Sequence, residues 1–292
     1  MSEIEALVNY AGEDQVVHFT DYLAQKASKP KKRTFRTGFD AFDKKLGLLE
    51  PGRVVVISGY AKNGKTLFTE SLIRGMMETD KTAKAVFFSF EIEPEKMMEK
   101  YKVDPNRGIH LPGQLKTMNF EWLLERCKEA KYKHNCSIIL LDHLHFLVDM
   151  NTKQNMSLNI GGFMRRLKFD VAMALGMVVF LNAHQEKGKE GEEASMRGAR
   201  DSSFIGQECD AFVSVTRKKN FTDKDFTEVK KRRGEIVALQ LQDELSEMEK
   251  NASWDDEYSH GLSVVKVDCS RMSGAFEART LFRKRGDFLV EA

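Results

Sequence analysis

The feature that most constrains this chain of 292 residues is a strand, a glycine-containing loop and a helix that follow one another between Val54 and Met77. The apolar residues 54–57 predict a buried strand, and apolar residues at helical spacing after Lys65 predict a helix. The octet between them, 59–66, has the pattern G-x-x-x-x-G-K-[ST], whose backbone wraps around a phosphate with its N–H groups inward. A chance glycine-rich turn is the alternative, and the flanking strand and helix disfavour it.

This octet supplies candidate ligands for a nucleotide and its metal. Lys65 is expected to contact the β- and γ-phosphates of ATP as a point charge, while the Thr66 hydroxyl completes the coordination of Mg²⁺. The N-terminus of the following helix adds positive potential. The candidate nucleotide-binding residues are Gly59, Tyr60, Ala61, Lys62, Asn63, Gly64, Lys65 and Thr66.

Acidic residues end two further predicted strands. Residues 84–90 lead to Glu91, and residues 137–141 lead to Asp142. Because ligands of open parallel sheets bind outside the carboxyl ends of the strands, both side chains are expected beside the phosphate loop. We predict that Glu91 polarises the attacking water and that Asp142 holds Mg²⁺ through water. Glu93 is an alternative base, and an ordinary carboxylate at a helix N-terminus is the non-catalytic interpretation of Glu91.

The fourth predicted strand, 177–181, ends in a polar tetrapeptide that contains His184. A polar residue at such a strand end is able to hydrogen-bond a γ-phosphate and to report its loss to the next segment. Residues 186–194 are charged and contain glycine. Lys187 and Lys189 are therefore candidates for contacts to a nucleic-acid backbone, with a solvated surface loop as an equal alternative.

Two stretches near the third strand have less specific patterns. His143 and His145 directly follow Asp142, and ordinary loop histidines are at least as compatible with this position as a direct role. Residues 155–175 predict a helix whose basic side chains, Lys168 among them, face outward.

Charge and cysteine usage limit the function classes. The 46 Lys and Arg residues nearly balance the 44 Asp and Glu residues, so any nucleic-acid affinity must come from local basic loops. The four cysteines form no C-x-x-C pair, which favours a reducing compartment over zinc or disulfides. No run of about 18 apolar residues occurs. We expect a soluble protein of the bacterial or phage-infected host cytoplasm, with no membrane partner.

The order of these features resembles the RecA-like motor domain of ring-shaped replicative helicases, the DnaB-like group with bacteriophage and mitochondrial members. The resemblance covers about residues 35–217 and 262–290. Besides the octet, it rests on Thr37-Gly38-Phe39-Asp40, Phe88-Ser89-Phe90-Glu91, Ile139-Leu140-Leu141-Asp142-His143-Leu144, Ala183-His184 and Arg197-Gly198.

The resemblance implies an α/β fold, a RecA-like P-loop NTPase core with a mostly parallel twisted sheet flanked by helices and a C-terminal antiparallel hairpin. It implies that Glu91 is the catalytic base and that His184 senses phosphate, as a histidine does in some phage members. Loops that match 186–197 hold single-stranded DNA in the family, which adds Arg197 to the two lysines of this loop as a candidate DNA contact.

The resemblance also implies an arginine finger at the C-terminal hairpin, and Arg271 matches it. In the family this arginine reaches the nucleotide of the neighbouring subunit. The turn is shorter here than is usual, and Cys269 stands where many members have lysine.

The predicted domains are a helical arm with a basic linker, residues 1–34, and an ATPase domain, residues 35–292. The arm either folds on its own domain or docks on a neighbouring subunit. Residues 217–260 are a charged insertion where the family has a short connection; a solvated surface insertion and a partner-docking element are both compatible with it. Within the insertion, residues 237–242 alternate like a strand while their neighbourhood also suits a helix.

The function expected from these features is ATP-driven, DnaB-like helicase or translocase movement on single-stranded DNA in replication. The assembly would be a hexameric ring or spiral with ATP and Mg²⁺ bound between subunits and a separate primase or loader as a partner. One alternative is a RecA-type recombinase or recombination mediator. Another is a regulatory ATPase of the clock-protein type that binds no nucleic acid.

Overall fold

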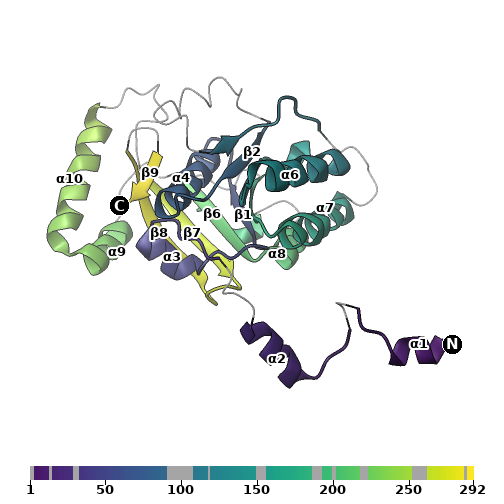
Figure 1. Cartoon of the computed structure of the whole chain (residues 1–292). Helices are drawn as coiled ribbons and strands as arrows, with labels where there is room; N and C mark the ends of the chain where they lie inside the picture. The colour runs from purple at the N-terminus through teal and green to yellow at the C-terminus, as the bar shows by residue number, and fades with distance from the viewer. Residues whose placement is uncertain are drawn as a thin grey trace. The chain divides into compact units, whose positions relative to one another are not determined.

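A computed structural model describes residues 3–12, 15–28, 33–90, 108–117, 119–148, 156–185, 193–198, 202–217, 223–251, 262–285 and 288–292. The chain folds as two units, Met1–Arg33 and Thr34–Ala292. The first unit contains the helices α1 (Glu3–Val8) and α2 (Phe19–Ser28). The second contains the sheet and the helices that cover it (Figure 1). Among the described residues, no helix combines the length and the apolar character needed to cross a membrane.

One sheet organises the second unit, with the described strands in the order β3-β2-β4-β5-β1-β6-β7-β8-β9. The strands from β3 to β6 are parallel, and β7, β8 and β9 continue the sheet antiparallel. This confirms the predicted mostly parallel sheet with a C-terminal antiparallel hairpin, to which β9 adds one more strand. The strands are β1 Val54–Gly59, β2 Ala85–Ser89, β3 Ile109–His110, β4 Ile138–Asp142, β5 Val178–His184, β6 Ala211–Arg217, β7 Leu262–Ser270, β8 Phe276–Arg285 and β9 Phe288–Glu291.

Helices cover both faces of the parallel strands, because these strands are apolar on both faces. Successive side chains of a strand point to opposite faces, so Val54 and Val56 enter one apolar layer while Val55 and Ile57 enter the other. The helices of this unit are α3 Asp40–Leu46, α4 Lys65–Thr79, α6 Phe120–His134, α7 Met156–Arg166, α8 Ser202–Glu208, α9 Asp223–Arg233 and α10 Glu235–Asn251. Short 3-10 turns span Leu144–Phe146 and Met196–Gly198, and a π-helical segment, Leu167–Met173, follows α7.

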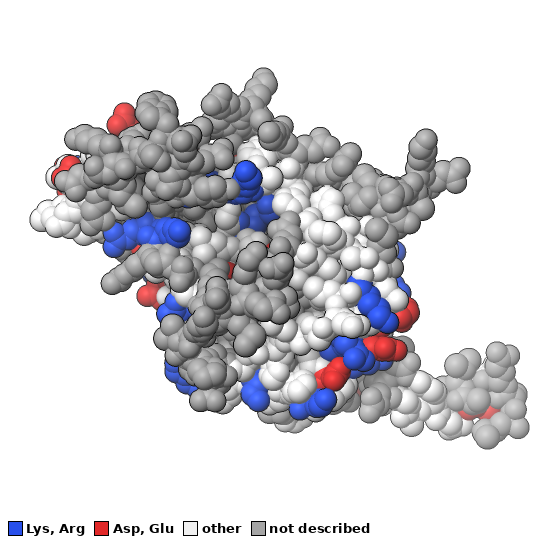
Figure 2. All heavy atoms as spheres, turned by 90° about the horizontal axis from the view of Figure 1, so that it is seen from above, with Lys and Arg blue, Asp and Glu red and all other residues white. Residues whose placement is uncertain are grey.

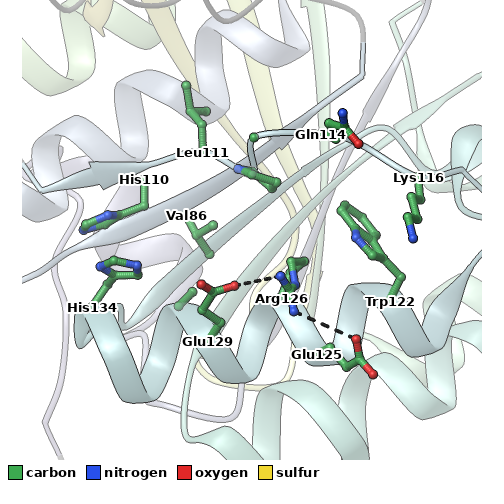
Figure 3. A pocket seen from close by; sticks show the side chains of 13 residues that line it. Val86, His110, Leu111, Gln114, Lys116, Trp122, Glu125, Arg126, Glu129 and His134 are labelled. Carbon is green, nitrogen blue, oxygen red and sulfur yellow. Dashed lines mark ion pairs between the residues drawn. The ribbon is translucent and has the colours of Figure 1, made fainter.

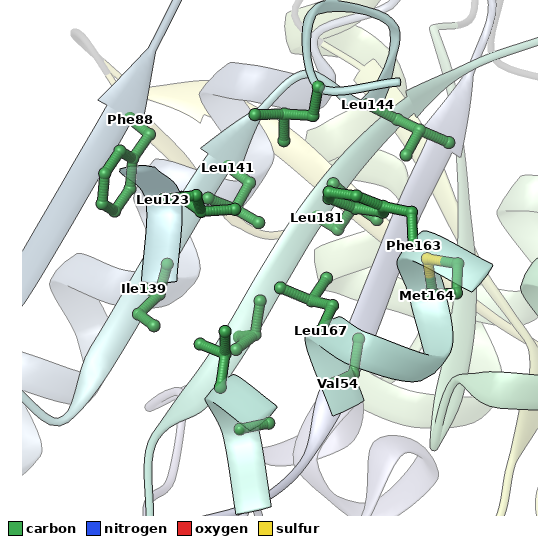
Figure 4. Close-up of a cluster of buried hydrophobic side chains, with 14 of the residues drawn as sticks. Val54, Phe88, Leu123, Ile139, Leu141, Leu144, Phe163, Met164, Leu167 and Leu181 are labelled. Atoms are coloured by element: carbon green, nitrogen blue, oxygen red, sulfur yellow. The ribbon is translucent and has the colours of Figure 1, made fainter. Parts of the chain in front are cut away.

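The first apolar layer lies between the sheet and the helices α6, α7 and α8. In Figure 4, Leu123 of α6 and Phe163 and Met164 of α7 point toward Leu141 and Leu181 of the strands. The second layer contains α3 and α4 on the opposite face, where Phe42, Phe68 and Phe282 meet edge to face at centroid distances between 5.1 and 5.9 Å. The result is a three-layer α/β/α unit.

The described part of the charged insertion, 223–251, folds as a helical hairpin of α9 and α10. Its segment 237–242, which the sequence leaves open between strand and helix, is helical. Val229, Ala238 and Leu241 of this hairpin are buried against Val264 of β7 and Leu281 of β8. The helical spacing therefore prevails because one face of α10 covers apolar residues of the antiparallel strands.

The prediction that Lys168 faces outward is wrong. Its side chain is 14% exposed, and its ammonium donates to the Gly52 carbonyl at 2.8 Å and to the Asp210 carboxylate. Asp210 is buried, and it also accepts from the backbone N–H of Val54 at 2.7 Å and from Arg53 at 3.0 Å. A buried carboxylate requires such partners, and Lys168 supplies one of them.

Candidate functional site

The octet forms a tight loop between β1 and α4, and two of its glycines are required by the backbone. A Cβ on Gly59 would lie 2.4 Å from the carbonyl oxygen of Val215, on the neighbouring strand β6. Gly64 has a φ of +79°, in the left-handed region that side chains other than glycine disfavour. Lys62 is also left-handed, with a φ of 62°. The loop conformation therefore follows from the two glycines that the motif specifies.

Lys65 begins α4 and points back into this loop. Its side chain is buried, and its ammonium donates to the Tyr60 carbonyl at 3.0 Å. It also lies 3.0 Å from Nδ1 of His184, at the end of β5. Because an ammonium group only donates, Nδ1 is the accepting nitrogen of this imidazole. The structure thus brings together two of the predicted catalytic residues, Lys65 and His184.

The two candidate magnesium ligands are also in contact. The Thr66 hydroxyl donates to Oδ2 of Asp142 at 2.7 Å. Asp142 ends β4, and it is 1% exposed. A hydroxyl and a carboxylate are hard oxygen donors of the kind that Mg²⁺ prefers, so this pair fits the ion that the motif implies.

Asn182 is a site residue that sequence reasoning missed. Its side-chain amide donates to Oδ1 of Asp142 at 2.9 Å and accepts from Thr69 of α4 at 2.7 Å. Asn182 is completely buried within β5. A polar residue inside an otherwise apolar strand was the signal available for it. Its contacts orient the Asp142 carboxylate toward Thr66.

Sheet order explains this convergence. The strands β4, β5 and β1 are neighbours and parallel, so their carboxyl ends meet at one edge. Gly59 and His184 are register partners across β1 and β5. Asp142 is the register partner of Ser89 on β2.

A cluster of histidines lies beside the same edge. The His143 ring is 4.1 Å from the His184 ring and 5.1 Å from the His145 ring. Burial, together with His184, His145 and Lys65, lowers the pKa of His143 to about 3, so this imidazole is neutral at pH 7. The sequence left open whether His143 is an ordinary loop histidine or has a direct role at the site. The structure places His143 in the group of side chains around Lys65.

Glu91 and Glu93 lie outside the described residues. The preceding residue, Phe90, donates its backbone N–H to the Asp142 carbonyl at 2.9 Å. The Phe90 ring stacks on Phe146 at 5.5 Å between centroids. The chain therefore leaves β2 beside Asp142.

The loop with the candidate DNA contacts is described only at its two ends. Lys187 and Lys189 lie outside the described residues, and of Arg197 only the backbone, in the turn Met196–Gly198, is described. Gln185 joins the two ends, because its side-chain amide donates to the Ser195 carbonyl at 2.7 Å and accepts from the Ser195 N–H at 3.4 Å. Sequence reasoning did not assign this role to Gln185, whose only signal was its polar position after the strand.

Arg271 lies at the opposite edge of the sheet from the phosphate loop. It follows β7 at the turn to β8, and its backbone N–H donates to the Asp210 carbonyl at 2.8 Å. Asp210 binds the first residue of β1, whereas the phosphate loop follows the last one. The Arg271 guanidinium is exposed and donates to the Gln207 carbonyl. The structure therefore does not bring Arg271 to the site of Lys65 in the same chain.

A separate cavity of about 770 Å³ lies between the edge strand β3 and α6 (Figure 3). His110 and His134 stack at one end of it, with ring centroids 4.5 Å apart. Arg126 pairs with Glu129 at 2.9 Å and approaches Glu125 at 3.9 Å. None of the predicted site residues lines this cavity.

The described charged side chains form no single field on the face shown in Figure 2. Among the described residues, Lys and Arg side chains lie there in several separate groups, with Asp and Glu beside some of them. This pattern agrees with the near balance of basic and acidic residues in the sequence.

No protein-family model and no curated protein matches this sequence. The solved structures that match this chain include two whose match covers 99% of it. The first, an ATPase domain, has a TM-score of 0.64 and 14% sequence identity, and the match covers 99% of this chain and 98% of that chain. The second is a DnaB-like replicative helicase described with its interactions with primase. It has a TM-score of 0.64 and 13% sequence identity, and the match covers 99% of this chain and 70% of that chain. The chain therefore has the RecA-like fold of DnaB-like helicase ATPase domains.

Proposed function

We propose that this protein is an ATP-driven helicase or translocase that moves on single-stranded DNA in replication, with its ATP sites between subunits. The observation that carries the proposal is the placement of two sets of residues on opposite edges of one sheet. Lys65, Thr66, Asp142 and His184 converge at the carboxyl edge, and Arg271 is exposed at the amino edge. The likeness in fold to an ATPase domain and to a DnaB-like replicative helicase supports the same function.

The residues at the carboxyl edge fit ATP with Mg²⁺. The loop backbone and Lys65 would hold the phosphates, and Thr66 and Asp142 would hold the ion, the latter through water. Bound Mg²⁺ supplies charge neutralisation for the transferred phosphoryl group. Asn182 keeps the Asp142 carboxylate oriented, and neutral His143 adds no competing positive charge.

Glu91 is the proposed general base. Its role is to accept the proton of the attacking water, for which a carboxylate within hydrogen-bond reach of that water is sufficient. Support comes from Phe90, the residue before Glu91, because its backbone N–H donates to the carbonyl of Asp142 at the end of β4.

Arg271 is proposed to act on the site of a neighbouring subunit. The six residues of β1 span about 17 Å, and Arg271 lies near the strand end that is remote from the phosphate loop. If Arg271 at the amino edge of one subunit reaches the nucleotide at the carboxyl edge of the next, the two subunits meet head to tail. Such a heterologous contact generates a ring when it closes and a spiral when it does not. We propose a hexameric ring or spiral on this basis.

Exposed apolar side chains of the first unit are compatible with contacts between copies. Ile4, Val8, Phe19 and Leu23 are between 47% and 78% exposed. Helices as short as α1 and α2 need packing partners to be stable in water.

The DNA is proposed to contact the loop 186–197 through Lys187, Lys189 and Arg197. A local contact is needed because the charges of the chain nearly cancel. Only Gln185 separates His184 from the start of the loop, so a change at the γ-phosphate would reach the loop through Gln185 and Ser195. A separate primase or loader is the proposed protein partner.

ATP hydrolysis measured with and without single-stranded DNA tests this proposal first. Stimulation by DNA supports it, and an ATPase that DNA leaves unchanged would favour a regulatory ATPase of the clock-protein type. Unwinding of a forked duplex then separates a helicase from a recombinase. Particle images with an ATP analogue and DNA provide a second criterion, because rings or short spirals support the helicase and long filaments favour the recombinase.

A further inference from the structure

Arg279 of β8 binds carboxylates from two separate segments of the chain. One terminal nitrogen donates to Glu193 at 2.9 Å and to Asp225 at 2.6 Å, and the other donates to Glu228 at 2.9 Å. The Arg279 side chain is 10% exposed, and Asp225 is fully buried. Charge-assisted bonds of this kind are shorter and stronger than neutral ones.

The two segments are the inserted hairpin and the loop that returns from the nucleotide site. Asp225 and Glu228 belong to α9, which packs on the antiparallel strands (Figure 1). Glu193 begins the described C-terminal end of the loop 186–197. A planar guanidinium with several donors is suited to joining such segments, whereas an ammonium group is a single point charge.

The segment after Glu193 is also bonded to the nucleotide side. The Ala194 N–H donates to the Thr216 hydroxyl at 2.7 Å, and Ser195 exchanges two hydrogen bonds with Gln185. Gln185 in turn donates its backbone N–H to the carbonyl of Gly59, the first residue of the phosphate loop, at 3.0 Å. A continuous set of contacts thus runs from the phosphate loop to α9.

We infer that Arg279 is a positioning residue that ties the C-terminal end of the loop 186–197 to the inserted hairpin. The tie holds one end of the loop while Gln185 holds both ends together. Its consequence for DNA rests on the proposed function, since a fixed loop end would set how the loop presents its basic residues to single-stranded DNA. The insertion would then have a mechanical role in the DNA response.

The test compares Glu193→Gln with Glu228→Gln. Both changes replace a carboxylate that accepts from the Arg279 guanidinium with a neutral amide, but only Glu193 belongs to the loop. Amide hydrogen exchange of the segment 193–198 should become about fivefold faster or more in Glu193→Gln, because local opening is then less costly, and should stay near wild type in Glu228→Gln. The single-stranded DNA concentration for half-maximal ATPase stimulation should rise roughly fivefold or more in Glu193→Gln alone.

Equal exchange in Glu193→Gln and Glu228→Gln would overturn the tie. Arg279→Lys is the second variant, in which a point charge replaces the fork, and it should reproduce the faster exchange of the loop segment. If Arg279→Lys does not fold, the comparison of Glu193→Gln with Glu228→Gln still tests whether Arg279 ties the loop end to α9. A wild-type ATPase that single-stranded DNA leaves unchanged would contradict the proposed function, while the exchange measurement would judge the tie independently.

Discussion

The Lys65 ammonium and Nδ1 of His184 lie 3.0 Å apart, although 119 positions separate the two residues in the sequence. Lys65 begins α4 and His184 ends β5, so the contact joins the phosphate loop to the strand end from which the loop 186–197 departs. A nucleotide that attracts the ammonium to its phosphates would compete with this contact. The pair therefore offers a direct route from nucleotide binding to the loop 186–197, the proposed DNA contact.

Lys65→Ala should weaken ATP binding roughly 10- to 150-fold, because a hydrogen bond to a charged group contributes about 1.5–3 kcal/mol. His184→Asn should retain most of the binding and lower turnover, since Lys65 still reaches the phosphates but the sensing contact is lost. Equilibrium binding of a fluorescent ATP analogue and steady-state ATPase rates separate the two effects. Unchanged turnover in His184→Asn would contradict the sensing role.

Glu91→Gln should bind ATP normally and lose turnover roughly 100-fold or more, because the amide cannot accept the proton of the attacking water. Glu93→Gln is the matched control, two positions along the same segment. A loss of turnover in Glu93→Gln with normal rates in Glu91→Gln would transfer the role of the base to Glu93. Both rates should be measured at saturating ATP.

Replacing Lys187 and Lys189 with alanine should flatten the salt dependence of binding to single-stranded DNA. Each lost phosphate contact lowers the slope of log affinity against log salt by about 0.7, so the double variant should lose about 1.4. Lys224 and Lys231, which are exposed on α9, provide a matched double-alanine control. The same slope in the loop variant and in wild type would exclude these contacts.

Arg271→Ala should lower turnover about a thousandfold or more, as expected for an arginine that stabilises the charge of a phosphoryl transition state. Mixing Arg271→Ala with Lys65→Ala should restore part of the activity, because some interfaces then combine an intact loop with an intact finger. ATPase measured over a series of mixing ratios tests this. Mixed assemblies that never exceed the sum of the parents would place the complete site within one subunit.

His110 should make folding stability depend on pH. Burial, then His134 and Lys84, lowers the pKa of His110 in the folded protein, so the unfolded chain takes up the proton first. The contribution to stability is then present above about pH 6.5 and decreases as the pH falls below it. Urea unfolding at about pH 7.5 and about pH 5.5 should show a smaller acid loss in His110→Asn than in wild type. The exposed His18→Asn is the control, and an equal acid loss in both variants would contradict the expectation.

Several elements follow from local sequence alone. The start of α6 is stabilised by Asn119, the residue just before it, whose side chain accepts from the Trp122 N–H at 2.9 Å. The strand, loop and helix of the phosphate site are encoded in the same local way, by apolar spacing and by glycines at positions that the backbone requires. The parallel order of the strands then places Asp142 and His184 at one edge, as predicted.

The tertiary structure decided the features whose partners are distant in sequence. Residues 237–242 are helical because a helix brings Ala238 and Leu241 onto one face, where they pack against Val264 and Leu281. The additional strand β9 pairs with β8, and its Glu291 accepts from the backbone N–H of Phe42 at 2.7 Å.

The inward position of Lys168 and the contact of Asn182 with Asp142 have the same origin. Each satisfies a buried carboxylate, and the position of that carboxylate depends on strands that meet only in the folded sheet. Apolar periodicity and glycine positions are properties of neighbouring residues, so the sequence determined the motif and the edge at which it acts. The hydrogen-bond partners of a buried carboxylate come from segments that are distant in sequence and close in the folded chain. Only the fold therefore determined which side chains complete the site.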